Sequence, residues 1–232
     1  MKTEHQVIRT KNCVTDAAAF ILERAHEAIG ERNEFRIALS GGNTPAPVYA
    51  RLAAEVHDFP WEKVRFTFGD ERCVPPSDPQ SNFRMARENL FATAAVPEKS
   101  IMRMRGEIDP QIAAHEYEQQ LDAIAVQDGE PIYQHDLILL GLGDDGHTAS
   151  LFPGTAALEE MTRTVVANFV PKLNTWRLTL TFPLINGARH ILFLVGASKS
   201  SELIERVLEG DRQFPAARVN PSAGEVTWII GE

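Results

Sequence analysis

The sequence predicts an α/β fold in which helices flank a mostly parallel β-sheet. Short segments rich in β-branched residues alternate along the chain with longer segments whose apolar residues recur at helical spacing. Two of the strand-like segments, 136–140 and 190–197, are continuous apolar runs, as expected for strands covered on both faces. Neither a repeat nor a long linker interrupts the 232 residues, so we expect a single domain spanning residues 1–232.

Helical periodicity and terminal signals predict the helices. Thr15 or Asp16 is the expected N-cap of the first helix, and Gly30 is its expected end. Thr44 caps the second helix, and Pro45 follows at the first helical position, where its missing N–H is not needed. The predicted helices cover residues 14–30, 44–56, 81–91, 109–125 and 198–210.

The remaining apolar segments predict strands. Segments 163–170 and 176–183 follow one another with no predicted helix between them, so we expect them to add antiparallel or mixed strands. The strands that alternate with helices are expected to be parallel. They cover residues 35–39, 64–68, 136–140, 190–197 and 225–230.

Composition narrows the class of protein. A formal net charge of −9 argues against a general nucleic-acid binder, which would carry a basic stripe. Cys13 and Cys73 do not make a disulfide framework, and they suggest free thiols in a reducing compartment. The longest apolar runs, such as 191–197, are far shorter than the roughly 20 residues of a membrane span. With no signal-peptide pattern at the N-terminus, we expect a cytoplasmic protein that binds neither nucleic acid nor membrane.

Ligands of open α/β sheets bind beyond the carboxyl ends of the strands, and three loops leave such ends here. The first is "SGGNTP", Ser40 to Pro45, between a predicted strand and a predicted helix. Two glycines let the backbone approach a ligand, and the helix N-terminus offers free N–H groups to a phosphate. The loop lacks the lysine of a P-loop and the three glycines of a dinucleotide fingerprint. A tight turn capped by Thr44 is the alternative interpretation.

The second loop runs from Phe68 to Asn82 and is long and rich in proline. Long loops of compact domains are often functional. Arg72 can pair with a phosphate through two N–H groups. A solvated turn at residues 70–72 with internal ion pairs is the alternative.

The third loop belongs to "ILLGLGDDGHTASLFPG", Ile138 to Gly154. A turn needs glycine but not histidine, so the place of His147 directly after a buried strand indicates function. Asp144, Asp145 and His147 would need further ligands to hold a metal, and no spacing elsewhere supplies them. We therefore expect no metal. A serine hydrolase is not expected, because no G-x-S-x-G motif is present.

The stretches "SGGNTP", "GDERCVPPSDPQSN" and "GLGDDGHTASLFPG", in this order, resemble the 6-phosphogluconolactonase family. The resemblance extends through "PKLNTWRLTLTFPLINGARHILFLVGASK" and covers nearly the whole chain. It departs from the family at Asn43, where serine is frequent, and at residues 172–177, which are less rich in proline. The family belongs to a wider glucosamine-6-phosphate isomerase/deaminase group. This implies a modified Rossmann-like architecture without a bound nucleotide.

The resemblance implies hydrolysis of 6-phospho-D-glucono-1,5-lactone to 6-phospho-D-gluconate, in the pentose phosphate pathway and without a cofactor. It implies that His147 is the general base and that Asp145 orients it. The only partner implied is the sugar-phosphate lactone, with the chain a monomer or small homo-oligomer. Lys199 is a further cation that can reach the phosphate. The expected substrate-binding residues are Ser40, Gly41, Gly42, Asn43, Thr44, Asp70, Arg72, Lys172 and Arg177.

Three alternative functions are each disfavoured by the sequence. Glucosamine-6-phosphate deaminase/isomerase enzymes continue their Asp-Gly-His motif with Ile-Ala-Phe-Asn-Glu-Pro, and this chain has no glutamate there. A non-catalytic sugar-phosphate-binding protein of this fold usually carries an added helix-turn-helix, for which 232 residues leave no room. Hydride transfer is disfavoured because the first loop lacks G-x-G-x-x-G.

Overall fold

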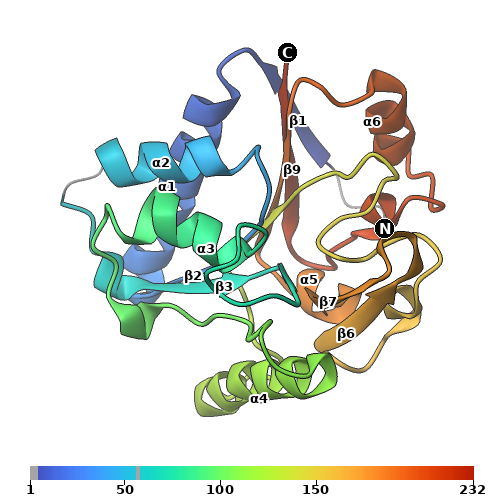
Figure 1. Ribbon diagram of the computed structural model, residues 1–232. Helices are drawn as coiled ribbons and strands as arrows, with labels where there is room; N and C mark the ends of the chain where they lie inside the picture. The colour runs from blue at the N-terminus through green and yellow to red at the C-terminus, as the bar shows by residue number, and fades with distance from the viewer. Residues whose placement is uncertain (1–4, 56–57) are drawn as a thin grey trace.

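The computed structural model describes residues 5–55 and 58–232, which form two β-sheets surrounded by helices (Figure 1). The larger sheet has six parallel strands in the order β1-β9-β8-β5-β2-β3. These strands are β1 (His5–Thr10), β2 (Phe35–Leu39), β3 (Val64–Phe68), β5 (Leu137–Leu140), β8 (His190–Val195) and β9 (Glu225–Gly231). Within the described ranges, no helix is long and apolar enough to cross a membrane.

A smaller antiparallel sheet has the order β4-β7-β6. Its strands are β4 (Asp70–Arg72), β6 (Val165–Val170) and β7 (Thr175–Leu180). Gly69 joins the two sheets, since its N–H donates to the carbonyl of Leu39 and its carbonyl accepts from Leu180, each at 2.9 Å. The chain therefore passes directly from β3 into the smaller sheet, which places β4 next to the carboxyl end of the larger sheet.

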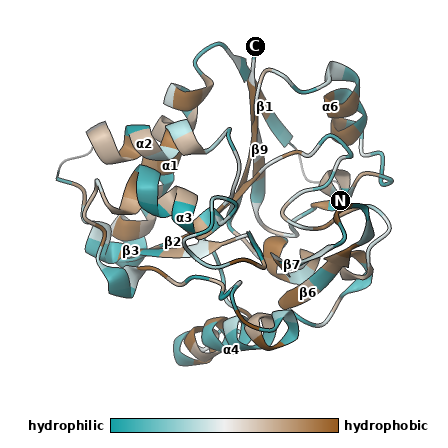
Figure 2. Ribbon diagram, in the orientation of Figure 1, coloured by the Kyte–Doolittle hydropathy of each residue, from teal (hydrophilic) through white to brown (hydrophobic). Residues whose placement is uncertain are grey.

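Helices cover both faces of the larger sheet (Figure 1). On one face lie α1 (Cys13–Arg32), α2 (Ala46–Glu55) and α3 (Asn82–Ala86), which continues as a π-helical turn at Arg87–Phe91. On the other lie α4 (Pro110–Asp128), α5 (Phe182–Ile185), α6 (Ser201–Leu208) and the smaller sheet. Figure 2 shows both hydrophobic and hydrophilic residues on α4, in keeping with one buried and one exposed side.

The central strand β5 shows why its sequence is continuously apolar. Leu137 and Leu139 pack in the core beneath α1 and α2, and Ile138 and Leu140 pack in the core on the α4 side. Alternate side chains of a strand point to opposite faces, so a strand with helices on both sides needs apolar residues at every position. The predictions of buried strands at 136–140 and 190–197 agree with this arrangement.

The strand order changes direction between β2 and β5. After β2 the chain adds β3 on one side, and it later returns to add β5 on the other side. Helix α2 follows β2 on one face, whereas α4 precedes β5 on the opposite face. The loops that leave β2 and β5 therefore diverge, and a crevice opens at the carboxyl ends of these strands.

The predicted fold class is confirmed, including the additional antiparallel strands, which form a sheet of their own with β4. Two strands are absent from the prediction. Strand β1 lies at the sheet edge and is half-exposed, so its residues show little apolar pattern. Strand β4 consists of three charged residues, and its segment was predicted to be a loop.

The predicted ends of the first helix are wrong. Its N-cap is Asn12, so Thr15 and Asp16 lie inside the helix. The helix continues through Gly30 to Arg32 and ends at Asn33, which takes the left-handed conformation with φ of 58°.

The other predicted helices are present with shifted ends. In α2, Pro45 accepts the hydrogen bond from the N–H of Tyr49, and the helix begins at Ala46. Val56, the predicted end of that helix, lies outside the described residues. Asp109 caps α4 as predicted, because its carboxylate accepts from the N–H groups of residues 111 and 112.

Candidate active site

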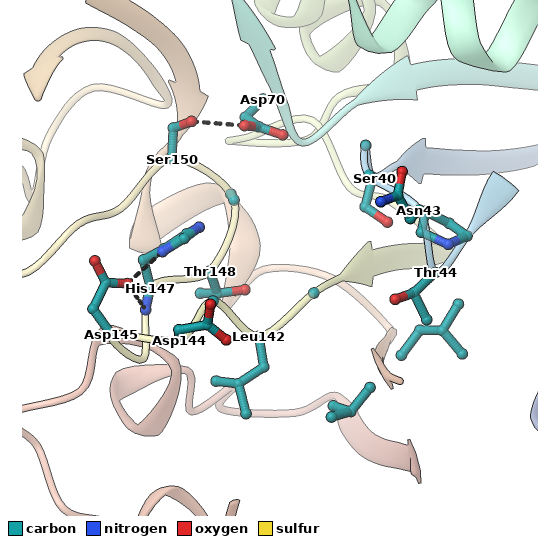
Figure 3. Close-up of a pocket in the computed structure, with 18 of the residues that line it drawn as sticks. Ser40, Asn43, Thr44, Asp70, Leu142, Asp144, Asp145, His147, Thr148 and Ser150 are labelled. Carbon is teal, nitrogen blue, oxygen red and sulfur yellow. Dashed lines mark hydrogen bonds and ion pairs between the residues drawn. The ribbon is translucent and has the colours of Figure 1, made fainter. Parts of the chain in front are cut away.

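A cleft of about 530 Å³ lies at the crevice (Figure 3). Its walls come from the loops after β2, β5 and β8, from β4, and from the connection between β6 and β7. All residues that the sequence predicts for the site line this cleft: Ser40, Gly41, Gly42, Asn43, Thr44, Asp70, Arg72, Asp145, His147, Lys172 and Arg177. The fold thus gathers residues from distant parts of the chain into one site.

His147 and Asp145 form a hydrogen-bonded pair in the loop after β5 (Figure 3). The Nδ1 atom of His147 lies 2.5 Å from Oδ1 of Asp145. Burial raises the pKa of Asp145, but hydrogen bonds from His147 and Lys172 outweigh it and hold this pKa at about 2. An ionised carboxylate can only accept, so Nδ1 carries the proton of this hydrogen bond, which leaves Nε2 as the ring nitrogen that can accept one.

The loop backbone holds the imidazole in place. A Cβ atom at Gly143 would lie 2.0 Å from Nδ1 and Cε1 of His147, so the ring rests directly against this glycine. Gly146 has φ of 75°, a conformation that side chains rarely adopt. The ring of Phe152 stacks on that of His147, with centroids 4.0 Å apart. These contacts explain why glycines surround the histidine in the sequence.

The loop after β2 is held by the side chain of Tyr49, a residue of α2. The hydroxyl of Tyr49 accepts from the N–H of Ser40 at 3.0 Å and donates to its carbonyl at 2.9 Å. Gly42 has φ of 100°, which turns the chain before α2. In Figure 3, Ser40, Asn43 and Thr44 lie across the cleft from His147 and Asp145. The loop therefore faces the Asp145–His147 pair from the opposite wall.

Arg72 and Arg177 are opposite one another on β4 and β7. Arg72 donates to the carbonyl of Gln80 at 2.6 Å, and its buried Nε has no hydrogen-bond partner in the described part of the chain. Burial and the neighbouring Arg72 guanidinium lower the pKa of Arg177. Neither guanidinium forms an ion pair among residues 5–55 and 58–232. This positive charge favours an anionic ligand.

The two lysines of the cleft are each paired with a carboxylate. Lys172 lies 2.9 Å from Oδ2 of Asp145, and Lys199 lies 2.6 Å from Oδ1 of Asp144. The hydrogen bond from Lys199 holds the pKa of Asp144 below its ordinary value. Asp144 is thus an ion-pair partner at the cleft rim, with 92 % of its side chain exposed.

Glu71 is a buried polar residue of this region that was not expected from the sequence to have a role. Glu71 is 2 % exposed and accepts from the N–H groups of Arg72, Asn82 and Phe83. Burial raises the pKa of Glu71 above its ordinary value, and these N–H groups offset only part of that rise. Instead of a solvated turn, the segment is tied together by a buried carboxylate. Its only sequence signal is an acidic residue directly after a buried strand.

The donor atoms for a metal are sparse. Among the residues that the structure describes, no group of three or more His, Cys, Asp and Glu side chains is placed to hold a metal ion. Asp145, which would have to be a ligand, already contacts His147 and Lys172. Both carboxylate oxygens of Asp145 are therefore already engaged by protein groups.

Comparison with known proteins agrees with this arrangement. The family described as glucosamine-6-phosphate isomerases/6-phosphogluconolactonase matches residues 9–228. A 6-phosphogluconolactonase of Synechocystis sp. is 42% identical over 230 residues, covering 97% of this chain and 94% of the relative. One from Nostoc sp. is 35% identical over 214 residues, covering 90% and 87%. A crystal structure of a 6-phosphogluconolactonase from Thermotoga maritima has a TM-score of 0.85 at 28% identity, covering 99% of this chain and 100% of that one.

The fold and the cleft define the class: an α/β protein with its site at the point where the order of a parallel sheet reverses. The chain belongs to the family of glucosamine-6-phosphate isomerases/6-phosphogluconolactonases. The resemblance stated from the loop motifs is thereby confirmed.

Proposed function

We propose that this chain hydrolyses 6-phospho-D-glucono-1,5-lactone to 6-phospho-D-gluconate, a step of the pentose phosphate pathway, with His147 as the general base. Family membership supports the reaction, as do the relatives named 6-phosphogluconolactonase at 35–42% identity over most of the chain. No observation in the cleft favours the deaminase/isomerase or the non-catalytic alternative.

One observation carries the proposal: a single cleft holds both an oriented histidine and arginines that have no ion-pair partner among the described residues. The substrate likewise has two separate groups, an ester carbonyl at one end and a dianionic phosphate at the other. A hydrolytic group and an anion site in the same cleft suit such a molecule.

The chemical step follows from the geometry of His147. Its Nε2 accepts a proton from water as the water oxygen attacks the lactone carbonyl carbon. The tetrahedral intermediate then collapses, the bond from this carbon to the ring oxygen breaks, and the imidazolium returns the proton to that oxygen. Asp145 stabilises the imidazolium, because its ionised carboxylate lies 2.5 Å from Nδ1. No cofactor is needed, since the lactone is already an activated ester.

We assign the phosphate to Arg72 and Arg177, with the backbone N–H groups of the Ser40–Thr44 loop. Unlike Lys172 and Lys199, neither arginine has a carboxylate partner in the described ranges. The buried Nε of Arg72 also lacks an acceptor there, which a phosphate oxygen would supply. Lys172 reaches the phosphate only by leaving Asp145, so we place it in the outer part of the site.

The remaining proposals concern the setting of the reaction. The thiols of Cys13 and Cys73 are free, in keeping with a reducing compartment such as the cytoplasm. We propose that the chain acts as a monomer or small homo-oligomer, with the lactone and its product as its only ligands.

A coupled assay tests the proposed function. Freshly made 6-phosphogluconolactone is added to the enzyme, and 6-phosphogluconate is measured and corrected for spontaneous lactone opening. Unphosphorylated glucono-1,5-lactone, followed by acid release, is the matched substrate without the phosphate. We expect kcat/KM to be far higher for the phosphorylated lactone, and equal values would contradict the phosphate assignment.

A further inference from the structure

A network of buried hydrogen bonds runs through Asp70. The amide nitrogen of Asn82 donates to the carbonyl of Asp70 at 2.9 Å and to its Oδ1 at 3.1 Å. The hydroxyl of Ser150 donates to Oδ2 of Asp70 at 2.6 Å, the contact drawn in Figure 3. Asp70, Asn82 and Ser150 are 9 %, 2 % and 1 % exposed. Protein donors therefore occupy both carboxylate oxygens of Asp70.

On one side, this hydrogen-bond network contacts the loop after β2 through Asn82. A Cβ atom at Gly41 would lie only 1.8 Å from the side-chain oxygen of Asn82, so the amide rests directly on this glycine. The N–H of Asn82 in turn donates to the buried carboxylate of Glu71 at 2.8 Å. Asn82 is thus fixed in place and in contact with the loop that we assign to the phosphate.

On the other side, the hydrogen-bond network holds the segment that carries His147 through Ser150. Ser150 follows His147 by three residues, across a turn in which Leu151 donates to the carbonyl of Thr148 at 2.9 Å. Ala149 takes the left-handed conformation within this turn, with φ of 46°. The N–H of Ser150 also contacts the hydroxyl of Thr179 on β7 at 3.2 Å. Ser150 is therefore held in place three residues beyond His147 by hydrogen bonds to Thr179 and Asp70.

We propose that Asp70 is a positioning residue that sets the separation between Gly41 and His147, acting through Asn82 and Ser150. This proposal rests on the proposed function and replaces direct substrate contact as the role of Asp70. A substrate anchored at its phosphate presents its carbonyl at a fixed distance from the anchor. The base must stand at the matching distance, and a misplacement of about 1 Å is enough to lower turnover by as much as 10²-fold.

Four variants separate positioning from direct chemistry. Ser150→Ala and Asp70→Ala each remove the hydrogen bond between these two side chains. We expect each variant to lower kcat for the phosphorylated lactone by about 10- to 100-fold with KM nearly unchanged. The double variant is expected to be no worse than the poorer single one, since both remove the same link. Asp70→Asn keeps a bridge, because its amide nitrogen can donate to the Ser150 hydroxyl and its oxygen can accept from Asn82. We expect it to stay within about threefold of wild type.

The unphosphorylated lactone supplies a readout that a loss of folded protein would not change. It has no anchor at the phosphate end, so Ser150→Ala should slow it much less than the phosphorylated lactone. Equal losses on both substrates would show a merely structural effect and overturn the proposal. An Asp70→Asn variant as poor as Asp70→Ala would overturn it too, because the charge itself would then be required. Unchanged kcat in Ser150→Ala, or a rise in KM alone, would do the same.

A crystal structure of Ser150→Ala tests the proposal independently of activity. We expect the distance between the Cα atoms of Gly41 and His147 to change by about 1 Å relative to wild type. An unchanged distance would overturn the positioning role even if the coupled assay supports the lactonase reaction. If wild type shows no lactonase activity but this distance shifts, the proposed function is wrong, whereas the positioning of His147 relative to Gly41 by Asp70 is confirmed.

Discussion

The larger sheet has a cleft at each end of its strands, and the two clefts differ in how their charges are balanced. The cleft at the amino ends has about 500 Å³, close to the 530 Å³ at the carboxyl ends. Its arginines all face carboxylates: Arg24 lies 3.0 Å from Glu27, Arg32 lies 2.9 Å from Asp136, and Arg189 lies 3.4 Å from Asp136. Within the described residues, this cleft therefore offers an anionic ligand no arginine that lacks a carboxylate partner.

The carboxyl-end cleft has the opposite arrangement. Arg72 and Arg177 have no carboxylate partner among the described residues, and His147 has a partner that is held ionised. His190, at the amino end, lies 3.5 Å from Glu225, whose side chain is 77 % exposed. Cleft volume therefore does not distinguish a site from a surface hollow. Arginines without an ion pair in the described ranges and an oriented titratable group do, since both are costly to maintain without a function.

The largest expected effect separates the two histidines. His147→Asn removes the proposed base and should lower kcat by roughly 10²- to 10⁴-fold while leaving the fold intact. His190→Asn, at the amino-end cleft, is the matched control and should leave kcat unchanged. The measurement is the coupled assay, with circular dichroism to confirm folding. Near-normal turnover in His147→Asn would move the base to another residue.

The arginines provide the next comparison. Arg177→Ala should lower kcat/KM for the phosphorylated lactone by about 10- to 100-fold, mainly through KM, because a charged hydrogen-bond donor to the phosphate is lost. Arg189→Ala, from the other cleft, is the control and should have no effect. Unphosphorylated lactone should react equally with wild type and Arg177→Ala. A loss on both lactones would indicate that Arg177 does not act through the phosphate.

A smaller effect on stability follows from Asp145. Its folded-state pKa of about 2 lies below the ordinary value of 3.8, so its ionised form stabilises the fold above that value. This contribution is lost as the pH falls from 3.8 to about 2. Asp145→Asn should therefore be less stable than wild type at neutral pH, with a gap that narrows through this interval. Urea unfolding at several pH values measures the gap, and a constant gap would contradict the linkage.

The smallest effect is expected on removing metal ions. We expect full activity after dialysis against EDTA and assay in metal-free buffer, because a histidine base opens the lactone without a Lewis acid. Mass spectrometry on the dialysed enzyme checks that no metal remains. Activity that collapses on chelation and returns with one divalent ion would reassign Asp144, Asp145 and His147 as ligands.

The sequence by itself indicated the fold class and the loops that form the site. Continuous apolar runs predicted strands buried on both faces, and the glycines around His147 predicted a tight loop at a strand end. These are local signals, because burial on both faces and a left-handed backbone each restrict the residue types at a single position. The motif resemblance, now confirmed as family membership, relied on the same loops.

Only the tertiary structure decided which charges in the cleft are neutralised. Arg72 faces Arg177 because β4 pairs with β7, and β4 has no apolar pattern to reveal it as a strand. Lys172 pairs with Asp145 because the β6–β7 connection returns to the loop after β5. The partners of Asp70 likewise come from residues 12 and 80 positions away in the chain. Such contacts depend on which strands meet in space, and composition or periodicity along the chain does not specify that.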